Sequence, residues 1–562
     1  MPVKNPKLKI FLLTLLAGIL MGVSFPPINL FICSFFGIAI IIYLTLDSKN
    51  YRQFFFRNYL VFTFYQLITV SWLALSGLQK DADLFLLLGG TITIILHSLF
   101  LMIPTLIFFF VSRNIIIKRF PNFTLLFFPF FWTGFEYYHY LGEVSFPWLT
   151  IGNAFTTQLQ KIQFIEYTGV LGISFWVCVL SVMIYYIFLE FRKQYCEGGI
   201  FIFRKKKNVI IYFLILLIYF LPDFYSFLAS PRNKYTDYKT EGTLKVGIVQ
   251  PNVNPWIKWK ENSRVLTEEY AKEINDISGK NKNLDLIVFP EAAITYYILD
   301  PMSESKYGLL KDAVDSIGIP VLIGAPDLTL YTDTLNAPSD APKYNSKYRY
   351  AAYNSAVLFE KGKDKSALQK YHKIKLVVAS ERMPHQEKLI FLKNLIKWGV
   401  GISSYEIGTD TTIFNLKDKY SFNTAICYES IYPEFFSEFV KKGADFCVVI
   451  TNDGWWGKLF GTYQHNQYSV LRAIENRRWI VRSANTGISC FIDPYGNMIQ
   501  IAEINEKALL AQEIGISKEQ TFYTKHGDIT GIACMYFTVI LIFGGYSVKI
   551  IKRFRKKSER EL

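Results

Sequence analysis

The chain has 562 residues, of which 51% are hydrophobic and 17% aromatic, and it carries a formal net charge of +15. This length exceeds one ordinary domain, and the apolar content is high for a soluble protein of this size. The positive charge does not predict nucleic-acid binding, because much of it lies beside apolar stretches, as in Arg204–Lys207 and Lys552–Lys557, which is typical of membrane topology signals.

Eight apolar stretches approach the roughly twenty residues that are needed to cross the hydrocarbon core of a bilayer. They are residues 8–24, 29–46, 56–76, 86–111, 121–139, 168–190, 208–224 and 529–548. The first has lysines before it and no good small-residue cleavage site, so we interpret it as an uncleaved anchor. We predict about seven membrane-spanning helices in residues 1–230, one in 529–548, and a basic tail in 549–562.

Every second loop between these stretches is rich in Lys and Arg. Arg52 and Arg57 lie in one loop, Arg113 and Lys118 in another, and Arg192 in a third, whereas the intervening loops carry few cations. The positive-inside rule puts these three loops and both termini in the cytoplasm. Residues 243–525, which follow seven spans and precede one, are therefore predicted on the outer side of the membrane.

The loop between the fifth and sixth predicted spans is long and aromatic, and it contains Trp148 within Phe146–Leu149. One interpretation is an aromatic anchor at the membrane interface. The other is a wall or entrance for a lipid substrate.

Residues 243–525 have ordinary globular composition and short apolar runs. The runs are 244–249, 284–289, 321–323, 355–359, 424–427, 446–450 and 488–492. Runs of this length, apolar on both faces, predict central strands of covered sheets. Amphipathic stretches at 263–277, 308–316 and 465–478 alternate with some of them, so we predict a layered α/β domain.

Seven cysteines are scattered without CxxC spacing, so the sequence does not predict a structural zinc site. Cys447 and Cys490 lie within apolar runs and are predicted to be core residues. Cys427 instead ends such a run, Glu291 ends another, and Lys373 lies in a polar-to-apolar transition. A thiol, a carboxylate and an ammonium, each at the edge of an element, fit a cysteine nucleophile with its base and oxyanion partner.

Lys375 competes with Lys373 for the role of oxyanion partner. In an extended segment the two side chains point the same way. The residues alone leave this choice open.

The order Glu, Lys, Cys resembles the nitrilase (carbon–nitrogen hydrolase) superfamily. The resembling stretches are Val246–Asn252 with Lys258 and Trp259, Phe289–Glu291, Tyr371–Lys373, Ile426–Glu429, Thr451–Gly457, Arg482–Gly487 and Thr521–Tyr523. Together with the apolar spans they make the chain similar, from end to end, to the apolipoprotein N-acyltransferase family. The resemblance implies an α-β-β-α sandwich and a catalytic triad of Glu291, Lys373 and Cys427.

The resemblance also implies the reaction. A fatty acyl group passes from a membrane glycerophospholipid, commonly phosphatidylethanolamine, to a thioester on Cys427 and then to the α-amino group of the S-diacylglyceryl-cysteine of an apolipoprotein. The enzyme is expected in the bacterial inner membrane as a monomer, with its catalytic domain in the periplasm. No metal or organic cofactor is implied.

Further roles follow for the neighbours of the triad. Glu381 steadies the lysine or closes a loop, Glu429 orients neighbouring groups, and the Tyr428 N–H is a second oxyanion donor. Trp259, Trp455 and Trp456 either line the path of the acyl chain or belong to the core. One departure is the segment Leu376–Glu381, which lacks the Pro and Gly that the family usually carries there.

Two other functions remain open. One is a membrane-tethered amidase or nitrilase that uses water as its second substrate. The other is a transporter or receptor whose nitrilase-like domain only binds. A lipid-derived thioester that persists until an amine arrives distinguishes the acyltransferase from the hydrolase.

Overall fold

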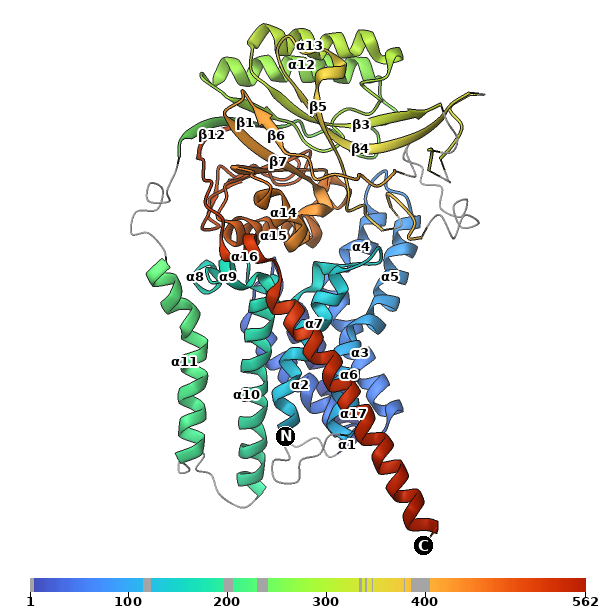
Figure 1. Cartoon of the computed structure of the whole chain (residues 1–562), viewed down its shortest axis with the longest axis vertical. Helices are drawn as coiled ribbons and strands as arrows, with labels where there is room; N and C mark the ends of the chain where they lie inside the picture. The colour runs from blue at the N-terminus through green and yellow to red at the C-terminus, as the bar shows by residue number, and fades with distance from the viewer. Residues whose placement is uncertain are drawn as a thin grey trace.

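The computed structural model describes residues 5–114, 123–196, 206–229, 241–332, 336–338, 341–345, 347–378, 380–385 and 405–561. A bundle of helices forms one part of the molecule, and two stacked β-sheets with their own helices rest on one end of it (Figure 1). α1 and the far end of α17 lie on the side of the bundle away from the sheets. The bundle contains α1 (Pro6–Val23), α2 (Ile32–Asp47), α3 (Tyr51–Thr69), α4 (Trp72–Leu75), α5 (Phe85–Leu101), α6 (Ile103–Asn114), α7 (Phe128–Tyr140), α10 (Val170–Cys196), α11 (Lys206–Ala229) and α17 (Ile529–Glu561).

The prediction of eight spans is not confirmed. Among the described residues, five helices are long and apolar enough to cross a membrane, or six if the pair Tyr51–Thr69 and Trp72–Leu78, bent by 50°, counts as one span. The predicted second span is a helix of 16 residues, α2, and the predicted fifth becomes α7, with 13 residues. The start of that fifth stretch lies outside the described residues.

α7 packs closely against α17, whose residues Ile529–Ile550 are one of the five candidate spans. A Cβ atom at Gly134 would lie only 2.8 Å from the backbone of Cys534 in α17, so the glycine permits close contact between α7 and α17.

The two sheets have six strands each. The first has the order β12-β1-β2-β3-β4-β5 and the second β11-β10-β9-β8-β7-β6. β1 and β2 pair in parallel, as do β2 and β3, β7 and β8, and β8 and β9, whereas the outer pairs are antiparallel. The strands are β1 (Thr243–Gln250), β2 (Leu286–Val288), β3 (Val321–Tyr331), β4 (Arg349–Phe359), β5 (Gln369–His372), β6 (Phe414–Leu416), β7 (Tyr420–Ile426), β8 (Phe446–Thr451), β9 (Ile480–Ala484), β10 (Cys490–Ile492), β11 (Met498–Ile499) and β12 (Ala508–Gly515).

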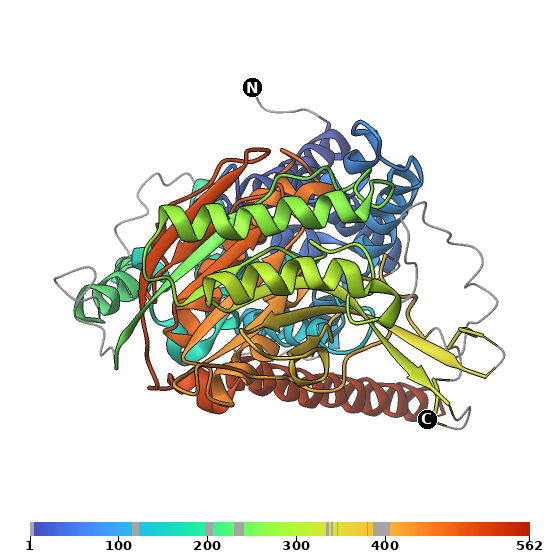
Figure 2. The same ribbon diagram turned by 90° about the horizontal axis from the view of Figure 1, so that it is seen from above.

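Helices cover the outer face of each sheet and complete four layers. α12 (Ser263–Lys280) and α13 (Glu304–Ile317) lie side by side over the first sheet (Figure 2), and α14 (Pro433–Lys441) and α15 (Phe460–Asn476) lie between the second sheet and the bundle. Buried apolar side chains such as Val246, Phe422 and Val448 fill the space between the sheets. The predicted α-β-β-α sandwich is confirmed.

The sandwich and the bundle share one continuous hydrophobic core. Residues of the second sheet and α15, such as Val449 and Leu471, belong to the same buried cluster as the bundle residues Phe62 and Trp148. The Gln464 side chain of α15 crosses the junction. Its Oε1 accepts hydrogen bonds from the indoles of Trp72 (3.0 Å) and Trp148 (2.6 Å), and its Nε2 donates to the carbonyl oxygens of Pro26 and Thr69, both at 2.9 Å.

We predict that Gln464→Glu destabilises the junction. A glutamate keeps the acceptor but removes the N–H donors and adds a buried charge, which costs about 2–4 kcal/mol. Thermal unfolding in detergent measures this, and Gln160→Glu, at an exposed position of α8 (Leu159–Ile162), is the control, with an expected change under about 0.5 kcal/mol. Equal unfolding temperatures for the two variants would contradict the role of Gln464.

Candidate active site

Cys427 lies where β7 ends and a short 3-10 helix, η9 (Cys427–Ile431), begins. Its φ is +53°, a left-handed conformation that is unfavourable for a residue with a side chain and is characteristic of functional turns. The residue is 8% exposed. Glu429 stabilises this turn, because its Oε2 accepts a hydrogen bond of 2.8 Å from the Ile426 N–H.

Glu291 follows β2, next to β3. A Cβ atom at Gly324 in β3 would lie 2.7 Å from the Glu291 Cα, so only glycine allows the two segments to approach this closely. The Glu291 Oε1 accepts hydrogen bonds from Lys373 Nζ (3.1 Å) and Asn354 Nδ2 (2.8 Å), and its Oε2 accepts one from the Asn452 N–H (3.1 Å). These donors fix the carboxylate in a nearly buried position.

Lys373 joins Glu291 to Glu381. Its Nζ lies 3.1 Å from Glu291 Oε1 and 3.0 Å from Glu381, while Asn354 Nδ2 donates to both carboxylates at 2.8 Å. Burial alone would lower the pKa of Lys373, but the charges of Glu291 and Glu381 raise it well above its ordinary value. Lys373 is therefore a fully charged ammonium, which can stabilise a developing oxyanion.

Lys375, the competitor of Lys373, lies in different surroundings. Its Nζ is 5.3 Å from the ring centroid of Tyr432 and 5.6 Å from that of Phe435. The expectation that the two lysines point the same way is wrong, because β5 ends at His372 and strand alternation stops there. The structure thus brings Lys373, and not Lys375, to Glu291.

The thiol of Cys427 is electrostatically coupled to this pair. Burial and the Glu291 carboxylate raise its pKa well above the ordinary value, whereas Lys373 lowers it. The resting thiol is therefore protonated, so that its attack on a carbonyl requires a base.

Tyr428 and Glu429 follow Cys427 in η9. Burial raises the pKa of Glu429 to about 7, although hydrogen bonds from the Tyr371 hydroxyl (2.6 Å) and the Ile374 N–H (2.7 Å) lower it. Glu429 thereby connects the turn at Cys427 to the segment that carries Lys373. The Tyr428 hydroxyl donates to the carbonyl oxygen of Ser145 in the bundle, at 2.9 Å.

Of the four predicted tryptophans, Trp148 and Trp456 pack against each other, whereas Trp455 and Trp259 have other neighbours. Trp148 is only 1% exposed and packs against Trp72 and Trp456, with ring centroids 4.9 and 5.6 Å away, so it lies inside the junction between the sandwich and the bundle. The half-buried Trp455 contacts the Trp256 ring (4.8 Å). Trp259 is half-buried beside Lys258.

Sequence reasoning did not assign a role to Lys258, which lies 1% exposed next to the Glu291 segment. Its Nζ donates to the carbonyl oxygen of Ala292 at 2.7 Å. Burial lowers the pKa of Lys258 to about 8, although the charge of Glu291 raises it. The available sequence signal for Lys258 was its position between Trp256 and Trp259. A lysine buried among such side chains requires a partner for its charge.

Lys258 gives a pH-dependent prediction. Because its pKa is about 8 in the folded chain and 10.5 for an ordinary lysine, the unfolded chain binds more protons between these values, and the contribution of Lys258 to stability rises with pH in that interval. Wild-type stability relative to Lys258→Met should therefore increase from pH 8 to pH 10.5. Paired thermal unfolding curves at each pH measure the difference, and a constant difference would contradict the lowered pKa.

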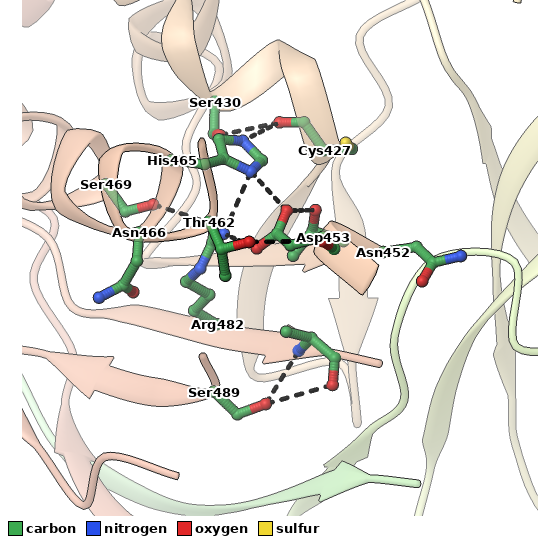
Figure 3. A network of polar contacts seen from close by, with 12 residues as sticks. Cys427, Ser430, Asn452, Asp453, Thr462, His465, Asn466, Ser469, Arg482 and Ser489 are labelled. Atoms are coloured by element: carbon green, nitrogen blue, oxygen red, sulfur yellow. Dashed lines mark hydrogen bonds and ion pairs between the residues drawn. The ribbon is translucent and has the colours of Figure 1, made fainter. Parts of the chain in front are cut away.

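A second polar network, also unassigned from the sequence, contacts the turn at Cys427 through His465 (Figure 3). Asp453 accepts hydrogen bonds from Thr451 Oγ1 and His465 Nδ1, both at 2.7 Å, and from Arg482 Nη2 at 2.7 Å. Burial opposes its ionisation, but His465 and Arg482 lower the pKa of Asp453 to about 2. The sequence signal for this network was Arg482 within the apolar strand β9, because a buried arginine needs a carboxylate partner.

Cys427, Asp453 and His465 bring three possible ligand atoms within 4.8 Å of one another. The surroundings oppose a bound cation. Both oxygens of Asp453 already accept hydrogen bonds, and Arg482 places a positive charge beside them. The donor set is better explained as a hydrogen-bond network than as a metal centre.

Comparisons with known proteins agree with this architecture. Residues 17–183 match the model of the apolipoprotein N-acyltransferase N-terminal domain, and residues 245–522 match that of the carbon-nitrogen hydrolase. An apolipoprotein N-acyltransferase from Chlorobaculum tepidum is 30% identical over 541 residues, which cover 95% of this chain and 96% of the relative. The chain belongs to the apolipoprotein N-acyltransferase family. This membership confirms the prediction of an acyltransferase and of its carbon–nitrogen hydrolase domain.

Other matches are more distant. A family member from Geobacter metallireducens is 25% identical and aligns over 98% of this chain and 96% of its own. Among solved structures, a Saccharomyces cerevisiae protein of branch 10 of the nitrilase superfamily is 15% identical, with a TM-score of 0.35, and covers 49% of this chain and 91% of its own.

Proposed function

We propose that the chain transfers a fatty acyl group from a membrane glycerophospholipid, commonly phosphatidylethanolamine, to the α-amino group of the S-diacylglyceryl-cysteine of an apolipoprotein. Cys427 is the nucleophile, Glu291 the general base and Lys373 the oxyanion partner. The observation that carries this assignment is the ion pair of Glu291 and Lys373, whose atoms lie 3.1 Å apart and whose charges both act on the pKa of the buried Cys427 thiol.

The first half-reaction acylates the enzyme. Glu291 accepts the thiol proton as sulfur attacks the ester carbonyl, and Lys373 stabilises the oxyanion of the tetrahedral intermediate. The protonated Glu291 then gives its proton to the leaving alkoxide, which departs as a lysophospholipid. A thioester on Cys427 remains.

The second half-reaction transfers the acyl group. The neutral α-amino group of the acceptor attacks the thioester, Glu291 takes the proton that the amine loses, and the thiolate leaves and is reprotonated. Burial of Cys427 and Lys373 favours this outcome over hydrolysis, because a site that excludes water protects the thioester until an amine enters.

The proposal includes a location. Residues 1–230 and 529–548 anchor the chain in the bacterial inner membrane, residues 243–525 form the catalytic domain on the periplasmic side, and both termini, including the tail 549–562, are cytoplasmic. The distribution of cations in the loops supports this orientation. The proposed working unit is a monomer.

The test supplies purified enzyme with acyl-labelled phosphatidylethanolamine and a diacylglyceryl-cysteine peptide. We expect the label to appear as an amide on the peptide, with little free fatty acid. Labelled fatty acid in place of acylated peptide, together with hydrolysis of small amides, would favour the hydrolase. Binding without turnover would favour a catalytically inactive domain.

A further inference from the structure

We propose that His465 is a positioning residue for the nucleophile: its Nε2–H holds the carbonyl oxygen of Cys427 and so fixes the turn that presents the thiol to Glu291. This inference rests on the proposed function, because it assigns His465 to the acylation of Cys427.

The geometry starts from a fully buried imidazole near the beginning of α15. His465 Nδ1 lies 2.7 Å from Asp453 Oδ1, and Nε2 lies 3.1 Å from the Cys427 carbonyl oxygen and 3.0 Å from Ser430 Oγ (Figure 3). Ser430 Oγ also donates to the Cys427 carbonyl at 2.8 Å. Two side chains therefore converge on one backbone oxygen of the nucleophile.

The atoms that face the two ring nitrogens are acceptors. Nδ1 faces the carboxylate of Asp453, and Nε2 faces the carbonyl oxygen of Cys427. The Ser430 hydroxyl already donates to that carbonyl oxygen, so an N–H on Nε2 gives it a second donor.

Asp453 holds the imidazole from the other side. Arg482 Nη2 lies 3.2 Å from His465 Nδ1 and 2.7 Å from Asp453 Oδ2, so both side chains contact the same carboxylate. Asp453 thus keeps the ring in one orientation.

The need for this contact comes from the backbone of Cys427. A φ of +53° is unfavourable for cysteine and persists only where the surroundings fix it. The two donors to the carbonyl oxygen fix the peptide that follows Cα, and Gln464, the residue before His465, ties this part of α15 to the bundle. Without the Nε2–H the turn can relax, and a displaced sulfur attacks less efficiently.

The test compares two amides at this position. In His465→Gln the amide N–H reaches toward the Cys427 carbonyl, as Nε2 does, whereas in His465→Asn the amide is near the Nδ1 position and contacts only Asp453. We expect His465→Asn to lower the rate constant for acyl-thioester formation from phospholipid by about 10- to 100-fold, with KM changed less than about threefold. His465→Gln should recover most of the rate.

Ser430→Ala adds an independent variant, because it removes the other donor and leaves the ring in place. A several-fold slower acylation with unchanged KM, and slower alkylation of the thiol by iodoacetamide, would support the proposal even if the His465 variants do not fold. Equal rates for the Asn and Gln variants, or a Ser430→Ala enzyme with wild-type acylation, would overturn it. If wild-type enzyme forms no acyl-thioester, the proposed function itself fails, which is a distinguishable result.

Discussion

Replacing Lys373 with methionine is expected to reduce turnover by about 10²- to 10³-fold, which is the effect of removing one preorganised oxyanion donor. Methionine keeps an unbranched side chain of similar length, one atom shorter, and loses the charge and its hydrogen bonds. The acylation rate constant should fall, whereas phospholipid binding should change little, because Lys373 acts in the transition state. Single-turnover formation of the acyl-enzyme measures the two separately.

Lys375→Met is the matched control. It removes the same charge two residues away, where the ammonium lies over the rings of Tyr432 and Phe435 and not beside Glu291. We expect its acylation rate to stay within about threefold of wild type. A larger loss in Lys375→Met than in Lys373→Met would reverse the assignment of the oxyanion partner.

Replacing Glu291 with glutamine should lower the acylation rate by about 10²- to 10⁴-fold, the usual contribution of a general base. The reason is the raised pKa of the Cys427 thiol: without a base, almost none of it is thiolate near neutral pH. Raising the pH should restore part of the rate in Glu291→Gln, because solvent hydroxide then deprotonates the thiol. Rate constants for thioester formation across a pH series measure this rescue.

Glu381→Gln distinguishes the base from its neighbour. Both carboxylates contact Lys373 and Asn354, but Glu291 is the carboxylate whose charge most raises the pKa of Cys427. Glu381→Gln should therefore slow acylation less and should gain nothing from higher pH. An equal loss with equal rescue would mean that the two residues have been assigned the wrong way round.

The layered α/β domain could be predicted from the sequence because its strands are short apolar runs that alternate with amphipathic helices, and the resemblance to the nitrilase superfamily supplied the α-β-β-α order of the layers. β8, buried along its whole length, and α12, with its apolar stripe, are examples in which local pattern and packing agree. The lengths of the bundle helices were harder to predict. α7 has only 13 residues and packs against α17 through Gly134, a tertiary contact that no local pattern contains.

In the site, too, some residues were indicated by the local sequence and others depend on tertiary contacts. Glu291, Lys373 and Cys427 lie at element edges and belong to recognisable stretches, so their sequence positions indicated them. The sequence positions of the residues that hold these three side chains did not indicate their roles. Asn354 bridges two carboxylates from the middle of β4, and His465 reaches Cys427 from a helix 38 residues away, so their roles depend on how strands and helices stack.

The central claim is that Cys427 carries the acyl group, and intact mass after incubation with phospholipid alone tests it most directly. We predict that wild-type enzyme gains the mass of one fatty acyl group, that a diacylglyceryl-cysteine peptide removes it, and that Cys427→Ala gains nothing. Wild-type enzyme that binds phospholipid but gains no mass, or a Cys427→Ala enzyme that is acylated like wild type, would contradict the account.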